Sequence, residues 1–215
     1  MVERHSHHDV ERYKTVIKEA FTKHYEEGSD VWSNDASLVD ATKIAFDTAF
    51  KRLNRRLHLL DIGCGNGRHL MSLPNLASYT GIDLFHHENW ESYDGTKPFE
   101  VKFIQDDFLA WAMRQTQKFD LIVDNGCFHH QHPDEHFDYL QQISECLQSD
   151  GLFSVVVWGE VFREGNIDDY GRYHCYFSPE SIVQLIESTP LEVLRVIESK
   201  ALIGKSQLQV IALKK

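Results

Sequence analysis

The sequence predicts an α/β protein built on a doubly wound, mostly parallel sheet, and three observations indicate this fold class. Short apolar runs that suit buried strands alternate along the chain with segments that suit helices. The first of these runs is followed by three glycines at alternate positions, Gly63, Gly65 and Gly67, and then by a predicted helix start. The length of 215 residues suits one domain. We therefore expect a single domain over the whole chain, with a helical cap at 1–53 and the core at 54–215.

The spacing of apolar residues places the elements in chain order. Residues 9–27 carry apolar side chains at three- and four-residue steps, which predicts a helix that Gly28 ends. A second helix is expected over 36–53, and the first strand over 57–62. Further strands and helices alternate after this point. The expected strands are 78–83, 101–105, 119–124 and 152–158, and the expected helices are 66–72, 107–117 and 134–148.

The last part of the chain predicts one more helix and two strands. Ser178 suits a helix N-cap and Pro179 the first helical turn. Two strands are expected at 191–198 and 207–213. The segment 159–177, which precedes the helix, mixes charged and aromatic side chains, as a loop that contacts a substrate does.

Composition narrows the classes of partner and compartment. The net charge of −11 disfavours a broad nucleic-acid interface, which needs a basic face, and it disfavours anionic membranes. No apolar segment has the length of a membrane span, and the polar first residues do not match a signal peptide. The four cysteines are far apart and form no C-x-x-C pair, which favours a reducing compartment. We expect a cytoplasmic protein with no nucleic-acid or membrane partner; the oligomeric state stays open.

The glycine run favours one class of cofactor over another. Glycines at a strand end let the backbone turn sharply and let a ligand approach the peptide groups, so a nucleotide-like cofactor is expected there. A dinucleotide fingerprint, G-x-G-x-x-G, would need its third glycine where Arg68 stands. The run that starts at Asp61 instead spells D-x-G-x-G-x-G, which makes a nicotinamide-dependent oxidoreductase the weaker interpretation.

The D-x-G-x-G-x-G run resembles motif I of the class I S-adenosylmethionine-dependent methyltransferases. The following segments resemble the rest of that pattern in order, at 79–85, 103–108, 119–126 and 147–153. The resemblance is close over residues 55–160. It implies a Rossmann-like sheet of seven strands with an antiparallel last strand, and S-adenosylmethionine as the cofactor.

The resemblance also implies roles for residues at the strand ends. Asp83 is expected to accept hydrogen bonds from the cofactor's ribose hydroxyls. Asp107 is favoured over Asp106 for the adenine amine, although one of the two acids is an alternative helix cap. Asp61 is expected either to hold the ammonium group of the cofactor or to bond the amides of the glycine loop. The expected cofactor-binding residues are Asp61, Gly63, Cys64, Gly65, Gly67, Asp83, Leu84, Asp106, Asp107, Phe108, Asn125 and Gly126.

On the acceptor side, the family resemblance implies in-line transfer of a methyl group to a small-molecule acceptor. His129 and His174 are the candidate bases, and either His129 or His130 is expected to face the acceptor pocket. Tyr25, Trp32 and Tyr173 are the candidate substrate contacts, although Tyr25 and Trp32 suit plain cap packing equally well. No metal is expected, because no cysteine or carboxylate set completes a coordination sphere around the histidines near His129.

Two other interpretations of the function stay open at this stage. One is a methyltransferase that acts on a protein or, less favourably, on RNA. The N/D-P-P-Y/F motif of base-amino methyltransferases is absent, because residues 124–127 are Asp-Asn-Gly-Cys. The other is a non-catalytic protein that binds S-adenosylmethionine, since these motifs report binding more than catalysis.

Overall fold

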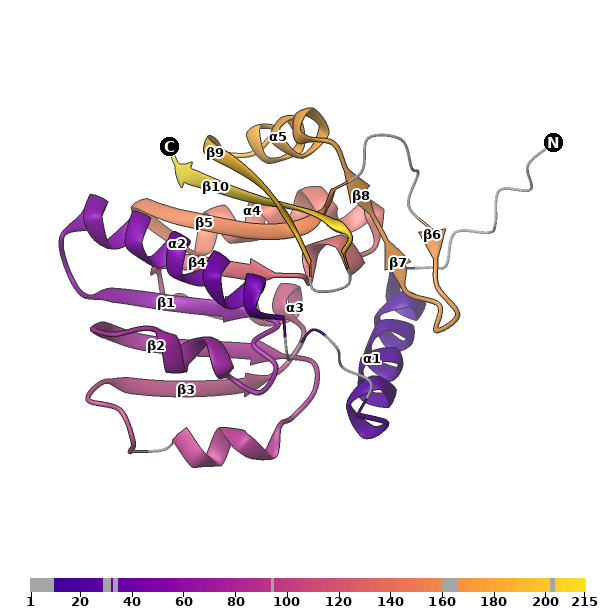
Figure 1. Ribbon diagram of the computed structural model, residues 1–215, viewed down its shortest axis with the longest axis horizontal. Helices are drawn as coiled ribbons and strands as arrows, with labels where there is room; N and C mark the ends of the chain where they lie inside the picture. Colours follow the sequence, from indigo (N-terminus) through magenta and orange to yellow (C-terminus); the bar gives the residue numbers. More distant parts are fainter. Residues whose placement is uncertain (1–9, 29–31, 33–34, 94, 160–165, 202–203) are drawn as a thin grey trace.

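A computed structural model describes residues 10–28, 32, 35–93, 95–159, 166–201 and 204–215 of the chain. Its helices and strands alternate as the apolar pattern predicts (Figure 1). The elements, with η for a 3₁₀ turn, are α1 (Val10–Glu26), α2 (Ala36–Leu53), β1 (Leu57–Ile62), η2 (Arg68–Ser72), β2 (Leu76–Asp83), η3 (Glu88–Tyr93), β3 (Glu100–Gln105), α3 (Phe108–Ala112), β4 (Phe119–Asn125), η4 (Phe128–His130), η5 (Pro133–Glu135), α4 (His136–Cys146), β5 (Leu147–Gly159), β6 (Asn166–Ile167), β7 (Tyr173–His174), β8 (Tyr176–Phe177), α5 (Pro179–Glu187), β9 (Leu191–Lys200) and β10 (Ser206–Lys214).

One twisted sheet organises the chain, in the strand order β3-β2-β1-β4-β5-β10-β9, and β8 pairs with β5 off this path. Strands β1 to β5 pair in parallel, so their carboxyl ends meet at one edge of the sheet. Strand β10 runs antiparallel to both β5 and β9. The predicted fold class is confirmed, including the path of seven strands and the antiparallel last strand.

Two apolar layers cover the two faces of the sheet. On one face, Phe46 and its neighbours on α2 pack against side chains such as Leu59 and Val123. On the other face, α3, α4 and α5 pack against alternate residues such as Leu60 and Ile122. This alternation follows from the two-residue period of a strand, because successive side chains point to opposite faces. Helix α2 therefore belongs to the layer over the sheet, rather than to the cap that was predicted over 1–53.

Two predicted helices are shorter than the sequence pattern indicates. Over 66–72 the chain forms only η2, because Gly67 enters it in a left-handed conformation and Pro74 forces the preceding Leu73 into an extended one. The helix predicted over 107–117 ends at Ala112 as α3, and Arg114 donates to the Ala110 carbonyl near its end. Neither change removes a predicted strand from the sheet.

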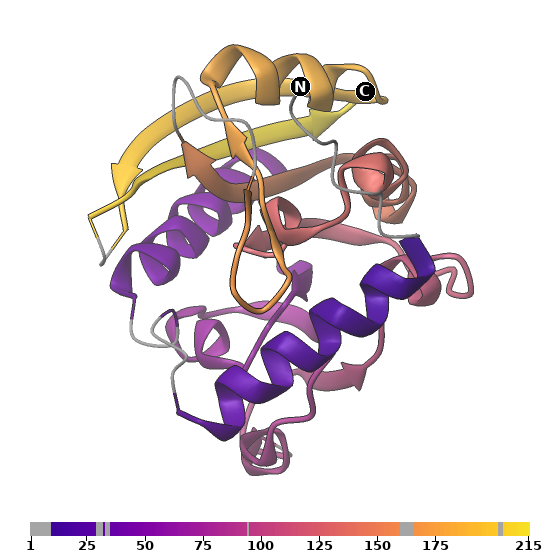
Figure 2. The ribbon, with the colours of Figure 1, turned by 90° about the vertical axis from the view of Figure 1, so that its right-hand side faces the viewer.

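Helix α1 lies across the carboxyl edge of the sheet rather than on a face of it. Figure 2, which views this edge, shows α1 crossing in front of the strand ends beside the β6–β7 hairpin. The fully buried Tyr13 fixes this position: its hydroxyl donates to the His130 carbonyl (2.6 Å) and accepts from the Tyr173 amide (2.9 Å). One phenol thereby joins α1, η4 and β7. None of the described helices is long and apolar enough to cross a membrane.

Replacing Tyr13 by phenylalanine is expected to lower the free energy of unfolding by about 1–3 kcal/mol, because a carbonyl and an amide lose their shared hydroxyl partner. Chemical denaturation would measure the change. Tyr93→Phe is a suitable control, since the Tyr93 hydroxyl has no hydrogen-bond partner among the described residues. Equal stability of Tyr13→Phe and the control would show that this hydroxyl does not fasten α1.

Candidate active site

The glycine loop between β1 and η2 is the first part of the site. Its backbone returns to the neighbouring strand, where the Gly63 amide donates to the Ile82 carbonyl (2.8 Å), and the Gly67 amide closes a turn onto the Cys64 carbonyl (2.9 Å). Gly63, Gly65 and Gly67 all have positive φ angles of 53–79°. Only glycine adopts this region without steric cost, so the alternate spacing follows from the shape of the loop.

The three glycines differ in what surrounds them. A Cβ on Gly63 would lie 1.9 Å from the Cys127 sulfur, and a Cβ on Gly67 would lie 2.7 Å from the Phe103 ring. These two glycines therefore serve internal packing. A Cβ on Gly65 would meet only the Tyr25 hydroxyl, at 3.5 Å, so the space in front of Gly65 belongs to the cavity. Of the three glycines, Gly65 is the one whose Cβ position opens into the cavity.

Asp83 ends β2 next to this loop. One carboxylate oxygen, Oδ2, accepts from the Gly65 amide (2.9 Å), and Oδ1 accepts from the Phe85 amide (3.0 Å). Burial raises the pKa of Asp83 to about 6, against the lowering effect of these backbone donors. The carboxylate lines the cavity beside Gly65, where the predicted ribose role requires it.

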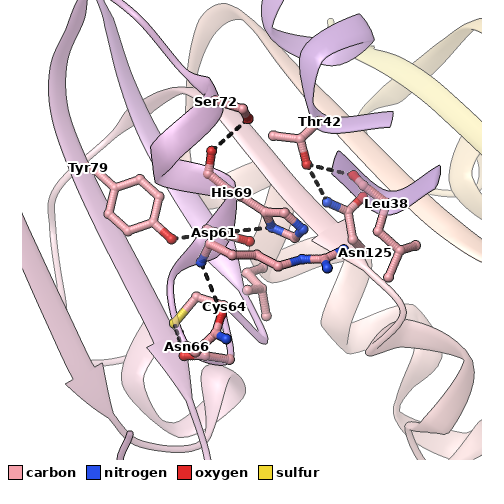
Figure 3. A network of polar contacts seen from close by, with 12 residues as sticks. Leu38, Thr42, Asp61, Cys64, Asn66, His69, Ser72, Tyr79 and Asn125 are labelled. Carbon is pink, nitrogen blue, oxygen red and sulfur yellow. Dashed lines mark hydrogen bonds and ion pairs between the residues drawn. The ribbon is translucent and has the colours of Figure 1, made fainter. Parts of the chain in front are cut away.

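Asp61 bonds two side chains through Oδ2, and its predicted role at the ammonium group of the cofactor stays a prediction, since Oδ1 is buried without a partner among the described residues. Asp61 is completely buried, and its Oδ2 accepts from the Tyr79 hydroxyl (2.7 Å) and bonds Nδ1 of His69 (3.1 Å). Figure 3 shows Asp61 between these two side chains. It does not line the cavity and bonds no amide of the glycine loop among the described residues. Asp61 instead orients His69, which does line the cavity.

The two acids after β3 both line the cavity, and each also has a local role. Asp107 is the N-cap of α3, where its Oδ1 accepts from the Ala110 amide (2.9 Å). Asp106 accepts from its neighbour's amide and pairs with Arg114 at 2.5 Å. The helix-cap alternative therefore applies to Asp107, which keeps Oδ2 for other contacts. The next residue, Phe108, packs into the core and also borders the cavity.

Asn125 and Gly126 follow β4 at the centre of the edge. Asn125 donates to the Thr42 hydroxyl (2.6 Å), which in turn donates to the Leu38 carbonyl (3.0 Å), as Figure 3 shows. The Asn125 Oδ1 is buried and has no partner among the described residues. Such an orphaned acceptor in a cavity wall is a place where a ligand donor would fit.

The cavity that these residues border has a volume of about 160 Å³. Four predicted site residues lie outside its lining: Asp61, Gly67, Tyr173 and His174. Tyr173 packs against Tyr13 of α1, and His174 bonds Asp168 (3.0 Å) in the turn of its own β6–β7 hairpin. The predicted residues that line the cavity are Tyr25, Trp32, Gly63, Cys64, Gly65, Asp83, Leu84, Asp106, Asp107, Phe108, Asn125, Gly126 and His129.

The cavity has a polar part and an aromatic part. Its charged side chains gather at the glycine loop and the ends of β2 and β3, whereas α1, η4 and β5 supply mostly apolar and aromatic walls. Sequence reasoning missed several of these walls because their neighbours are far away in the chain. Its position at the carboxyl end of β5 is the one signal that could have identified Trp158. The missed residues include Phe21, Asp35, Asn66, Gln131, Trp158 and Gln207.

Two neighbouring histidines on η4 line the aromatic part. Burial, with His130 and His174 nearby, lowers the pKa of His129 well below its usual value, and its Nδ1 is buried without a partner in the described structure. His130 is tied to the hairpin, because its Nδ1 lies 2.7 Å from the Tyr173 carbonyl. Both rings are therefore neutral at physiological pH and able to accept a proton.

The described side chains of this region do not form a metal site. Among the described residues, no group of three or more His, Cys, Asp or Glu side chains is arranged to hold a metal ion. All four cysteines are free thiols.

Dialysis against a strong chelator is expected to leave cofactor binding and methyl transfer unchanged. Calorimetry with S-adenosylhomocysteine and a transfer assay before and after dialysis would measure this. Activity that is lost and then restored by one specific divalent ion would contradict the expectation, and would point to the histidines after β4.

Comparison with known proteins agrees with this geometry. Residues 59–151 match a family model described as a methyltransferase domain. That range runs from the glycine loop through the strand ends of β2, β3 and β4 to the start of β5. A search among curated proteins gave no match.

Solved structures extend the likeness beyond that range. A Burkholderia thailandensis 1,6-didemethyltoxoflavin-N1-methyltransferase, solved with 1,6-didemethyltoxoflavin and S-adenosylhomocysteine bound, superposes with a TM-score of 0.86 at 25% identity, over 97% of this chain and 91% of that chain. A Clostridium acetobutylicum S-adenosylmethionine-dependent methyltransferase gives 0.64 at 14% identity, over 91% and 97%. The N-methyltransferase NodS from Bradyrhizobium japonicum gives 0.60 at 14% identity, over 81% and 86%.

Proposed function

We propose that this chain, which belongs to the class I S-adenosylmethionine-dependent methyltransferases, transfers the cofactor's methyl group to a nitrogen atom of a small-molecule acceptor. One observation carries the acceptor class: the cavity at the sheet edge continues from the glycine loop to aromatic walls, to which α1 contributes Phe21 and Tyr25. A cavity walled by aromatic rings suits a compact ring better than a polymer. The likeness to a small-molecule N-methyltransferase supports the same class.

The residues around the polar part fit S-adenosylmethionine. Asp83 would accept from the ribose hydroxyls, and Asp107 would use its remaining oxygen for the adenine amine. The open space at Gly65 would take the chain of the cofactor close to the backbone. The orphaned Oδ1 of Asn125 would accept a donor from the methionine end. These four roles account for the strand-end polar groups without a metal.

For the remaining chemistry, the protein would position the acceptor and exclude water from it. When it is bound, the cofactor supplies a sulfonium that makes its methyl group electrophilic. The aromatic chamber, lined by Phe21, Trp32 and Trp158, would hold the acceptor nitrogen in line with the bond that breaks, and would keep water away from it. A neutral histidine suits this place, because a cationic one would repel the sulfonium.

Titration calorimetry with S-adenosylhomocysteine and with NAD tests the cofactor, and only the first is expected to bind. Radiolabelled S-adenosylmethionine then tests the acceptor, with 1,6-didemethyltoxoflavin, a set of N–H heterocycles, a protein extract and total RNA offered in parallel. Label on a small molecule supports the proposal. Label on protein or RNA alone would overturn the small-molecule assignment, and binding without any transfer would indicate a non-catalytic protein.

A further inference from the structure

The hydrogen bonds of His130 fix which of its ring nitrogens carries a proton. Its Nδ1 lies 2.7 Å from the backbone carbonyl of Tyr173. A carbonyl only accepts, so Nδ1 must be the donor, and in a neutral ring Nε2 is left with a lone pair. No described residue bonds Nε2, and the ring lines the cavity. The imidazole therefore offers the cavity a hydrogen-bond acceptor of known tautomer.

The surrounding groups keep this ring in place and neutral. The His130 carbonyl accepts from Tyr13, and the ring packs edge-on against Phe21 (5.4 Å) and His174 (4.6 Å between centroids). Burial, with His174 and Arg172 nearby, lowers the pKa of His130 well below the usual histidine value, although the Tyr173 carbonyl and Asp168 oppose the shift. His129 differs, because its Nδ1 is buried without a partner in the described structure.

The cavity-lining residues of α1, η4 and β5, the elements around His130, include no Asp, Glu, Lys or Arg. Asp35 caps α2, where its carboxylate accepts from the amide and hydroxyl of Ser37, and the Arg68 guanidinium donates to the Asp35 carbonyl. The other charged lining groups, Asp83, Asp106 and Asp107, lie at the ends of β2 and β3. An ionic acceptor held against these three elements would therefore lose its hydration without a charged side chain beside it as a counter-ion.

We infer, on the basis of the proposed function, that the acceptor is a flat, uncharged heteroaromatic compound whose ring N–H donates to Nε2 of His130, and that His130 is the base of the reaction. Flatness follows from the aromatic walls, Phe21, Tyr25, Trp32 and Trp158. This assignment favours His130 over the predicted bases His129 and His174, because the bond to the Tyr173 carbonyl fixes the tautomer of His130, and His174 lies outside the cavity.

His130 takes up the one proton that the proposed step releases. A second, pyridine-type nitrogen of the same conjugated ring uses its in-plane lone pair to form the bond to the methyl carbon, and the carbon–sulfur bond breaks with its electron pair left on sulfur, which gives S-adenosylhomocysteine. The N–H proton passes to Nε2, and its bonding pair stays on the ring, which becomes neutral again. A weak base suffices, because the N–H of a ring that has gained a methyl group on its other nitrogen belongs to a cation and is far more acidic. The imidazolium then releases the proton to water.

Two substitutions of His130 distinguish the hydrogen bond from Nδ1 to the Tyr173 carbonyl from the proposed contact between Nε2 and the acceptor. The amide of His130→Asn would reach the Tyr173 carbonyl in place of Nδ1 but would leave nothing at the position of Nε2. The longer side chain of His130→Gln would place a carbonyl acceptor near Nε2, where it could accept an N–H but could not take a proton. The two variants thus form a matched pair.

Binding is measured on protein saturated with S-adenosylhomocysteine, using N–H compounds and their N-methyl partners: benzimidazole with 1-methylbenzimidazole, and theophylline with caffeine. We expect the wild type to bind at least one N–H compound about tenfold more tightly than its partner. His130→Asn should lose this preference, and His130→Gln should keep it. With S-adenosylmethionine, His130→Gln should methylate the bound N–H compound about 100-fold more slowly than the wild type.

Nitrogen-15 NMR of the wild type gives a test that does not depend on a variant's folding. The resonances of His130 should show protonated Nδ1 and bare Nε2, and the Nε2 signal should shift with the N–H compound only. No preference in the wild type, an unchanged preference in His130→Asn, or unimpaired methylation by His130→Gln would each overturn the inference. If S-adenosylhomocysteine still binds in that case, the proposed cofactor and reaction class are unaffected.

Discussion

Gly65→Val is expected to abolish S-adenosylhomocysteine binding, with a loss of at least about 100-fold in affinity. The valine Cβ would point into the space in front of the loop, where the described protein places only the Tyr25 hydroxyl, at 3.5 Å. A branched side chain there would occupy the path of the ligand. It would also strain a backbone with φ of 53°, at a cost of about 1–3 kcal/mol in stability. Calorimetry measures the affinity, and circular dichroism checks that the fold survives.

Gly95→Val is the matched control for this experiment. Gly95 has a similar φ of 64°, and a Cβ there meets no atom within 4 Å, but it does not line the cavity. The control should therefore share the backbone strain and keep normal affinity. Equal affinity of Gly65→Val and Gly95→Val would mean that the glycine loop does not contact the cofactor. Loss in both would mean that strain alone explains the effect.

The contrast among the three glycines also shows what the sequence could predict. The motif places all of them at a ligand, because their spacing is the same. The structure distinguishes them by neighbours that lie far along the chain, Cys127 and Phe103, which fill the space beside Gly63 and Gly67. Periodicity and spacing are local properties, so they predicted the order of the strands and the position of the loop. They could not predict which distant side chain fills each space.

The same limit explains the differences on the acceptor side. His174 and Tyr173 follow β5 in the chain, and that position predicted them at the cavity. The hairpin of β6 and β7 directs them instead to Asp168 and Tyr13. The tautomer of His130 also depends on a distant residue, because the Tyr173 carbonyl that sets it lies 43 positions away in the chain. Such a bond between distant residues carries no pattern in a single sequence.

Asp83→Ala is expected to weaken S-adenosylhomocysteine binding by about 1.5–3 kcal/mol, the range for hydrogen bonds to a charged group. The ribose hydroxyls and the Gly65 amide would both lose the carboxylate that accepts their hydrogen bonds. Asp47→Ala is the control, since Asp47 is exposed on α2 and lies outside the cavity. Calorimetry on the three proteins measures the difference. An unchanged dissociation constant for Asp83→Ala would remove this carboxylate from the site.

The pH dependence of the wild type gives this prediction a second, independent readout. Burial raises the pKa of Asp83 to about 6, so the carboxylate is ionised at pH 7 and becomes protonated toward pH 5. Protonation removes acceptor capacity, and affinity should therefore fall as the pH drops through 6, by up to about tenfold per pH unit. Unfolding does not explain such a fall. A folded-state pKa above the ordinary value stabilises the fold at low pH, and this contribution is lost as the pH rises through 6. Asp124, whose pKa burial also raises to about 6, acts on stability in the same direction. Asp83→Ala should show a flat profile over this range, whereas a profile parallel to that of the wild type would assign the titration to another group.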